Sequence, residues 1–149
     1  MKGTGRLSGK FLVRHIKIPA SIPIDEAIHH MLAAAHPAEA CDIVQRHLMA
    51  ELDDHRWYVV QRWIHKLPEE IAKQRPELLL AEAWGAYENF QLEKLQMLLG
   101  QVEFLIKDNE EAQHFMGEFY LMNGLIFHWS GQGKGALQYF QKAVKYLPE

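Results

Sequence analysis

The feature that most constrains the fold is the spacing of small and apolar residues in the last third of the chain, residues 117–149. This stretch predicts two short helices joined by the glycine-rich turn at 131–135. One face of each helix is apolar or small, at Tyr120, Gly124 and Phe127 in the first and at Ala136, Phe140 and Ala143 in the second. A single hairpin of this kind cannot bury its own apolar face, so the pattern predicts stacked neighbours.

The same pattern recurs upstream. A step of 41 residues back from the six positions leads to apolar or small residues throughout, at Leu79, Ala83, Ala86, Leu95, Leu99 and Val102. This period is longer than the roughly 34 residues of a standard tetratricopeptide (TPR) repeat, which implies TPR-like units with longer joints. The sequence therefore predicts an all-α fold, a TPR-like right-handed superhelix of antiparallel helix hairpins with about seven helices.

Two domains are expected. Residues 24–149 are expected to form the TPR-like helical-repeat domain. Its hairpins are expected at about 24–52, 76–107 and 117–148, with an extra helix at about 54–67. Residues 1–23 contain glycines, prolines and one short alternating run, and they are expected to form a basic leader that is flexible or holds a short strand.

Two helix caps are expected from acidic or amide residues. Asp25 stands at the start of the first predicted helix. The pair Asp108-Asn109 is expected to break one helix and to cap the next, which runs from about residue 110 to 130.

Composition excludes several classes of protein. Of the 149 residues, 48% are hydrophobic, which suffices for an ordinary core. The single cysteine, Cys41, excludes an internal disulfide and fits a reducing compartment. No apolar run approaches the roughly 18 residues of a membrane span or resembles a secretory leader, so a cytoplasmic protein without membrane contact is expected.

Charge is distributed unevenly. Residues 1–24 carry five basic residues and no acidic one, whereas the remainder holds 11 basic and 19 acidic residues. An acidic body repels phosphate backbones, so we expect no direct nucleic-acid binding by this chain.

No constellation of residues indicates catalysis or a cofactor. The run Ser8-Gly9-Lys10 lacks the first glycine and the final hydroxyl of a phosphate-binding loop. The nine histidines are scattered, without the helical spacing of a zinc site. The acidic pairs stand at helix starts, where they complement the helix dipole. We therefore expect a protein that is not an enzyme, with no catalytic residues, no metal and no cofactor.

A binding groove is the more promising site. In TPR-like stacks the first helix of each hairpin lines the concave face, and its outward side chains point into a groove. Trp and Tyr favour recognition because they combine a large contact area with a polar tip; the alternative is that Trp84 and Trp129 simply fill joints between repeats. The expected groove residues for a ligand or peptide are Leu80, Trp84, Tyr87, Glu88, Leu121, Leu125, His128 and Trp129.

Several sequence blocks resemble a known family. Residues 62–70 read RWIHKLPEE, RPELLL begins at Arg75, AWG begins at Ala83, and EAIHHMLAA begins at Glu26. In this order and spacing the blocks resemble the TPR-like helical region of MalT-like, LuxR-type (ATP-dependent) transcriptional regulators. Members of that family carry an ATPase module, the helical superhelix and a C-terminal DNA-binding helix-turn-helix. The chain shows neither flanking module, so DNA binding and ATP hydrolysis do not carry over to it.

The resemblance implies a non-enzymatic protein- or ligand-interaction module, like the helical sensor region of such a regulator. A freestanding TPR-like adaptor that binds a peptide segment of a partner protein is the alternative. The partner is expected to be a protein or peptide, with a small inducer as a further option. The last helix has no capping helix after it, so its apolar face either forms a homodimer through the C-terminal hairpin or belongs to a longer array.

Overall fold

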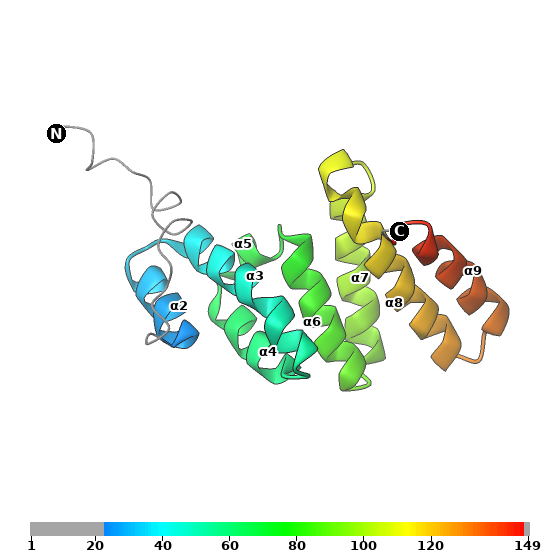
Figure 1. Cartoon of the computed structure of the whole chain (residues 1–149), viewed down its shortest axis with the longest axis horizontal. Helices are drawn as coiled ribbons and strands as arrows, with labels where there is room; N and C mark the ends of the chain where they lie inside the picture. Colours follow the sequence, from blue (N-terminus) through cyan, green and yellow to red (C-terminus); the bar gives the residue numbers. More distant parts are fainter. Residues whose placement is uncertain (1–22, 148–149) are drawn as a thin grey trace. The chain divides into compact units, whose positions relative to one another are not determined.

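The computed structural model of the chain describes residues 23–147 (Figure 1). In this range the regular elements are eight α-helices and one 3-10 helix, η2, with no strand. The all-α prediction is confirmed for this range, and the eighth helix is the short α5. The leader expected at 1–23 lies outside the described residues, apart from Pro23. The described residues divide into two compact units, with the boundary between residues 72 and 73, and the single domain expected at 24–149 stays a prediction.

The described part of the first unit holds four helices. They are α2 (Ile24–Ala33), α3 (Pro37–Asp53), α4 (Trp57–Lys66) and α5 (Glu69–Ala72). Helices α2 and α3 form a hairpin, and both α4 and α5 pack against α3. Pro37 occupies the first turn of α3, where its missing N–H is not needed. The core is built from the inward faces, with Ile28, Val44 and Val60 fully buried.

Asp25 does not cap α2, because Pro23 holds that position and makes no side-chain cap. The Asp25 carboxylate instead joins α2 to α4. It accepts a 2.8 Å hydrogen bond from Lys66 Nζ and a 3.0 Å bond from the Arg62 guanidinium. Its pKa is lowered to about 2, chiefly by the Lys66 bond. The expected cap was wrong because the tertiary ion pairs compete for the same carboxylate.

We expect Asp25→Asn to lower the free energy of unfolding by about 0.5–1 kcal/mol at neutral pH, since water screens these exposed ion pairs. A carboxyl whose pKa is lowered on folding stabilises the chain above its unfolded pKa, 3.8, and loses this effect as the pH falls through about 2. Urea unfolding at a series of pH values should therefore show the two proteins converging below pH 3.8. A difference that stays constant with pH would contradict the assignment.

The second unit contains two longer hairpins. Helices α6 (Pro76–Glu88) and α7 (Leu92–Ile106) form one, and α8 (Met116–Trp129) and α9 (Gly133–Val144) form the other. The element η2 (Glu110–Phe115) connects them and contacts α6, α7 and α8. All six positions found by the 41-residue step are buried at 3% exposure or less and belong to one core cluster.

The connection into α8 differs in part from the sequence prediction. The Asn109 side chain accepts a 3.1 Å hydrogen bond from the Glu111 N–H, as expected of a cap. The six residues that follow form the 3-10 helix η2, and the α-helix begins only at Met116. A 3-10 turn at a helix N-terminus is common, and apolar spacing alone cannot distinguish it from α-helix.

Close contact between α8 and α9 depends on glycine. A Cβ atom on Gly124 would lie 2.4 Å from a ring carbon of Phe140, and one on Gly135 would lie 2.4 Å from a ring carbon of Phe127. Each aromatic ring therefore packs directly on the backbone of the opposite helix. This explains the small residue that the repeat pattern places at the helix crossing.

Four helix-to-helix turns share one backbone geometry. In each, a residue with positive φ follows the helix cap: Ala35, His55, Phe90 and Gly131. The next N–H bonds to the carbonyl five residues earlier, as from Gln91 to Ala86 at 2.9 Å and from Gln132 to Phe127 at 2.9 Å. This is the Schellman motif, whose left-handed position favours glycine. Only one of the four turns has glycine there.

The strain at these positions predicts opposite effects for two substitutions. We expect Ala35→Gly to raise the free energy of unfolding by about 0.5–1 kcal/mol, because a Cβ disfavours φ near +59°. Gly131→Ala should lower it by about 1 kcal/mol, although nothing lies within 4 Å of the added Cβ. Thermal or urea unfolding measures both, and a shift of the same sign in both variants would be inconsistent with the proposed strain.

Candidate functional site

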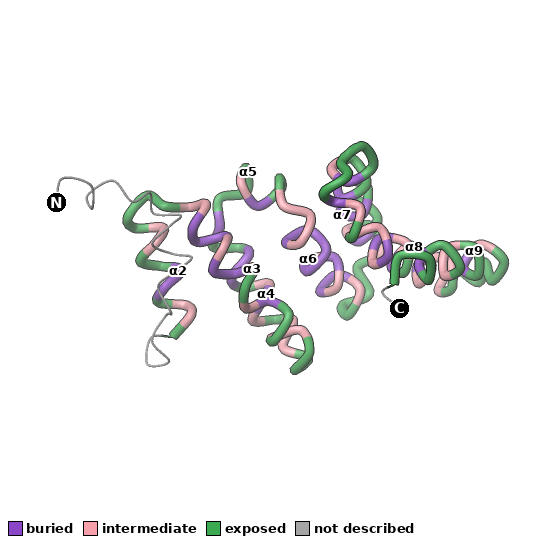
Figure 2. The backbone as a smooth tube through the Cα atoms, turned by 45° about the horizontal axis from the view of Figure 1, so that its top comes forward, coloured by how far each residue is buried: buried purple, intermediate pink, exposed green. Residues whose placement is uncertain are grey.

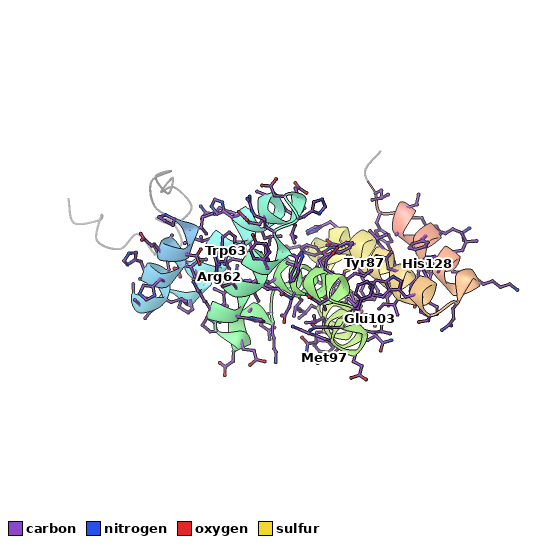
Figure 3. All side chains as sticks on the ribbon, turned by 90° about the horizontal axis from the view of Figure 1, so that it is seen from below. Arg62, Trp63, Tyr87, Met97, Glu103 and His128 are labelled. Atoms are coloured by element: carbon purple, nitrogen blue, oxygen red, sulfur yellow. The ribbon has the colours of Figure 1, made fainter. Side chains whose placement is uncertain are left out.

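Four aromatic side chains of the second unit meet near the C-terminal ends of α6 and α8. Trp84 and Tyr87 belong to α6, Phe90 lies in the turn that follows it, and Trp129 is the last residue of α8. Figure 3 labels Tyr87 on α6 and His128 on α8, the helices that carry this group. We call these four residues the aromatic cluster.

The rings form a continuous series of contacts. Tyr87 stacks on Trp129 with ring centroids 4.3 Å apart and planes 7° from parallel. Phe90 also stacks on Trp129, at 5.1 Å and 25°. Trp84 meets Tyr87 edge to face at 5.7 Å. Trp84, Tyr87 and Trp129 are each only partly buried, so the cluster presents ring surface to solvent.

Phe90 is the most unusual member of the cluster. Its side chain is 77% exposed, and its backbone has φ of +55°. A bulky residue in the left-handed region is a rare and strained choice where glycine is favoured. Because the ring is mostly exposed, it also gains little hydrophobic stabilisation from burial. Neither the turn nor the core requires phenylalanine at this position, which points to a role at the surface.

One side of the cluster is fixed by a polar contact. The Trp84 indole N–H donates a 2.5 Å hydrogen bond to the Glu118 carboxylate at the start of α8. Burial raises the pKa of Glu118, and the Trp84 bond opposes this by stabilising the charged form. The bond joins α6 to α8 and orients the Trp84 ring.

The structure brings together three of the eight expected groove residues, Trp84, Tyr87 and Trp129, in direct ring contact. Glu88, Leu121 and His128 are exposed, and Leu125 is partly buried. Leu80 is only 1% exposed and belongs to the core of the unit, so it presents no surface to a ligand. The use of this surface as a groove stays a prediction.

Sequence reasoning missed Phe90 and Glu118. Phe90 follows the helix and therefore falls outside any helical face. The only sequence signal is that an aromatic residue, Phe90, directly follows Asn89, the C-cap of α6. Glu118 looks like an ordinary acidic residue in a first turn, which the helix dipole explains. Its contact with Trp84 spans 34 residues, so helical spacing could not reveal it.

The surface near the cluster is shallow. An open depression beside it is lined by Phe90, Gln91, Leu92, Glu93 and Lys94. A second one lies on α7, where Figure 3 labels Met97, and its lining also includes Lys73, Gln74, Gly100, Gln101, Phe104 and Leu105. Among residues 23–147, no three His, Cys, Asp or Glu side chains stand together as metal ligands. The arrangement offers a partly exposed stack of aromatic rings beside an open depression.

The family-like sequence blocks serve mainly to build the fold. In the RWIHKLPEE block, Trp63 and Leu67 are buried in the first unit, whereas Arg62 and Lys66 hold Asp25. The leucines of RPELLL are buried in the second unit. Trp84 of the AWG block differs, because its ring remains partly exposed.

Comparison with known proteins supports the resemblance. Over 125 residues, or 83% of the chain, the sequence is 27% identical to the HTH-type transcriptional regulator MalT of Serratia proteamaculans (strain 568). The identity and coverage are the same for the MalT regulators of Yersinia pestis (strain Pestoides F) and Yersinia pseudotuberculosis serotype O:3 (strain YPIII). This similarity supports a MalT-like helical region. The chain spans 14% of the length of each of these relatives.

Two further comparisons give no match. No family model matches the chain, and no solved structure resembles it significantly. In the described part of the chain, no helix is both long enough and apolar enough to cross a membrane.

Proposed function

We propose that this chain is a non-enzymatic interaction module, the helical part of a MalT-like, LuxR-type regulator, with a TPR-like right-handed superhelical arrangement and a cytoplasmic location. Its aromatic cluster binds an extended segment of a partner protein or peptide. The similarity to MalT regulators supports the first statement, and the geometry of the cluster supports the second.

The observation that carries the proposal is Phe90. A phenylalanine that is 77% exposed at a left-handed turn position strains the backbone, and its ring gains little stabilisation from burial. Such a residue is explained if its ring contacts a partner. Its stacking on Trp129 extends the contact surface over two more rings, Trp129 and Tyr87. Trp and Tyr are the side chains that most often dominate binding energy at interfaces.

The shallow surface favours a peptide or protein segment over a small inducer. Small molecules bind in concave pockets that cover most of their surface, whereas the depression beside Phe90 is open and built from five consecutive residues. An extended chain can pack against the exposed parts of stacked rings without an enclosed cavity.

Selection from a displayed random-peptide library on the purified chain tests this function. Selected peptides should bind the wild type, and Trp129→Ala should weaken their affinity about tenfold or more. Trp57→Ala is the matched control, since Trp57 is a partly buried tryptophan in the first unit, and it should leave the affinity nearly unchanged. Failure to enrich any peptide, or equal losses in both variants, would refute peptide binding at the cluster.

A further inference from the structure

The C-terminal hairpin differs in charge from the rest of the helical chain. Residues 119–147 contain no aspartate or glutamate, whereas residues 25–118 hold 18 acidic and 8 basic residues. Apart from Glu118 in the first turn of α8, the charged residues of α8 and α9 and the residues up to 147 are lysines: Lys134, Lys142 and Lys145. All three are exposed, and Lys142 also lies over the rings of Tyr120 and Tyr139. The hairpin therefore presents a basic surface on an acidic protein.

Helix α9 also exposes a row of apolar side chains. Its small residues Ala136 and Ala143 are buried, while Leu137 and Val144 are 57% and 65% exposed. Figure 2 shows α9 as mostly exposed and intermediate. Leu137 and Val144 stand seven residues apart and so share one face. Lys134 and Gln141 lie in the same row, because Lys134, Leu137, Gln141 and Val144 are spaced three, four and three residues apart. Leu147, 62% exposed, continues the apolar surface after the helix.

We propose that this outer face of α9 docks an amphipathic helix of a partner protein, one with an apolar row flanked by aspartate or glutamate. A seven-residue apolar spacing is the pattern by which two helices pack along their lengths. The charge determines which residues should flank the partner's apolar row. Carboxylates there would lie near Lys134, at the start of the row, and Lys145, beside it, and residues 119–147 carry no acidic side chain. This surface is separate from the aromatic cluster and does not depend on peptide binding there.

A second copy of the chain fits this face less well. A symmetric pair formed through α9 would bring the same basic surface together from both copies, because a two-fold interface uses the same patch twice. Like charges across helices oppose such pairing. Self-association through α9 is therefore the competing outcome of the test.

Two synthetic peptides provide the probe. Both are amphipathic helices with leucine at the seam positions; one carries glutamate at the flanks and the other carries lysine. Fluorescence anisotropy with the full chain should show the glutamate peptide binding about tenfold or more tightly than the lysine peptide, with affinity that falls as salt is added. Equal affinities, or no binding of the glutamate peptide, would overturn the proposal.

Substitutions at exposed positions test whether the peptide binds to the outer face of α9, and they leave the core unchanged. Val144→Glu should weaken binding of the glutamate peptide about tenfold or more, and the double change Lys134→Glu and Lys145→Glu should reverse the preference between peptides. Met97→Glu is the control, since Met97 is a 55% exposed apolar residue on α7 of the same unit. Unchanged affinity in Val144→Glu overturns the site. So does sedimentation showing a dimer that Val144→Glu dissociates, because the occupant would then be a second copy.

Discussion

Gly124→Ala should lower the free energy of unfolding by about 1–3 kcal/mol, the range typical of overpacked cores. The added Cβ would stand 2.4 and 2.6 Å from two ring carbons of Phe140, well inside contact distance. The ring of Phe140, a residue of α9, could then no longer pack directly against the backbone of α8. Its displacement would loosen the packing between the two helices. Chemical denaturation monitored by circular dichroism measures the loss.

Gly100→Ala serves as the matched control for this prediction. Gly100 also lies inside a helix, α7, but nothing stands within 4 Å of its added Cβ. Alanine is the better helix former, so this variant should be more stable by about 0.5–1 kcal/mol. A second check uses Phe140→Ala: its effect should be smaller in the Gly124→Ala background than in the wild type, because the two residues touch. Equal effects of the two glycine substitutions would contradict the proposed close crossing.

Trp84→Phe should lower the free energy of unfolding by about 1–3 kcal/mol, because it leaves the half-buried Glu118 carboxylate without its indole donor. Glu118→Gln keeps an acceptor for the indole N–H and removes a partly buried charge, so it should be neutral or slightly stabilising at neutral pH. The contrast separates the hydrogen bond from the charge. If Glu118→Gln proved as damaging as Trp84→Phe, the charge itself would be the stabilising element.

The raised pKa of Glu118 adds a pH dependence to this pair. A carboxyl whose pKa rises on folding holds its proton more tightly in the folded chain, so its contribution to stability decreases as the pH rises from 4.5 through the folded pKa. Glu118→Gln lacks this titration. The free energy of unfolding of Glu118→Gln, relative to that of the wild type, should therefore increase over this pH range and stay constant at higher pH. Urea unfolding at several pH values checks the sign.

The hairpin cores could be predicted from the sequence because they depend on local spacing. A helix that faces one neighbour repeats its apolar residues every three or four positions, and Leu79, Ala83, Leu95 and Leu99 follow that rule. The 41-residue step then identifies the buried positions of one hairpin from those of the next. The right-handed superhelix depends on contacts beyond this spacing, and it stays a prediction.

The expected groove was less predictable for a physical reason. Four consecutive residues of α6, Leu78 to Ala81, are all buried, so burial on this helix does not follow a single face. Helical position alone therefore could not show that Leu80 is covered. Phe90 escaped prediction because the left-handed turn position is normally read from glycine or asparagine. The ion pairs of Asp25 escaped because they join residues about forty positions apart.

The most direct test of the central claim combines stability and binding in Phe90→Gly. Because glycine suits φ of +55°, the account predicts that the free energy of unfolding stays equal or rises by up to about 1 kcal/mol. Affinity for the selected peptides should fall about tenfold or more. Phe90→Ala, which keeps the strain and removes the ring, should lose the affinity without any gain in stability. A Phe90→Gly protein that binds as tightly as the wild type, or that is clearly less stable, would contradict the claim that this ring serves binding rather than folding.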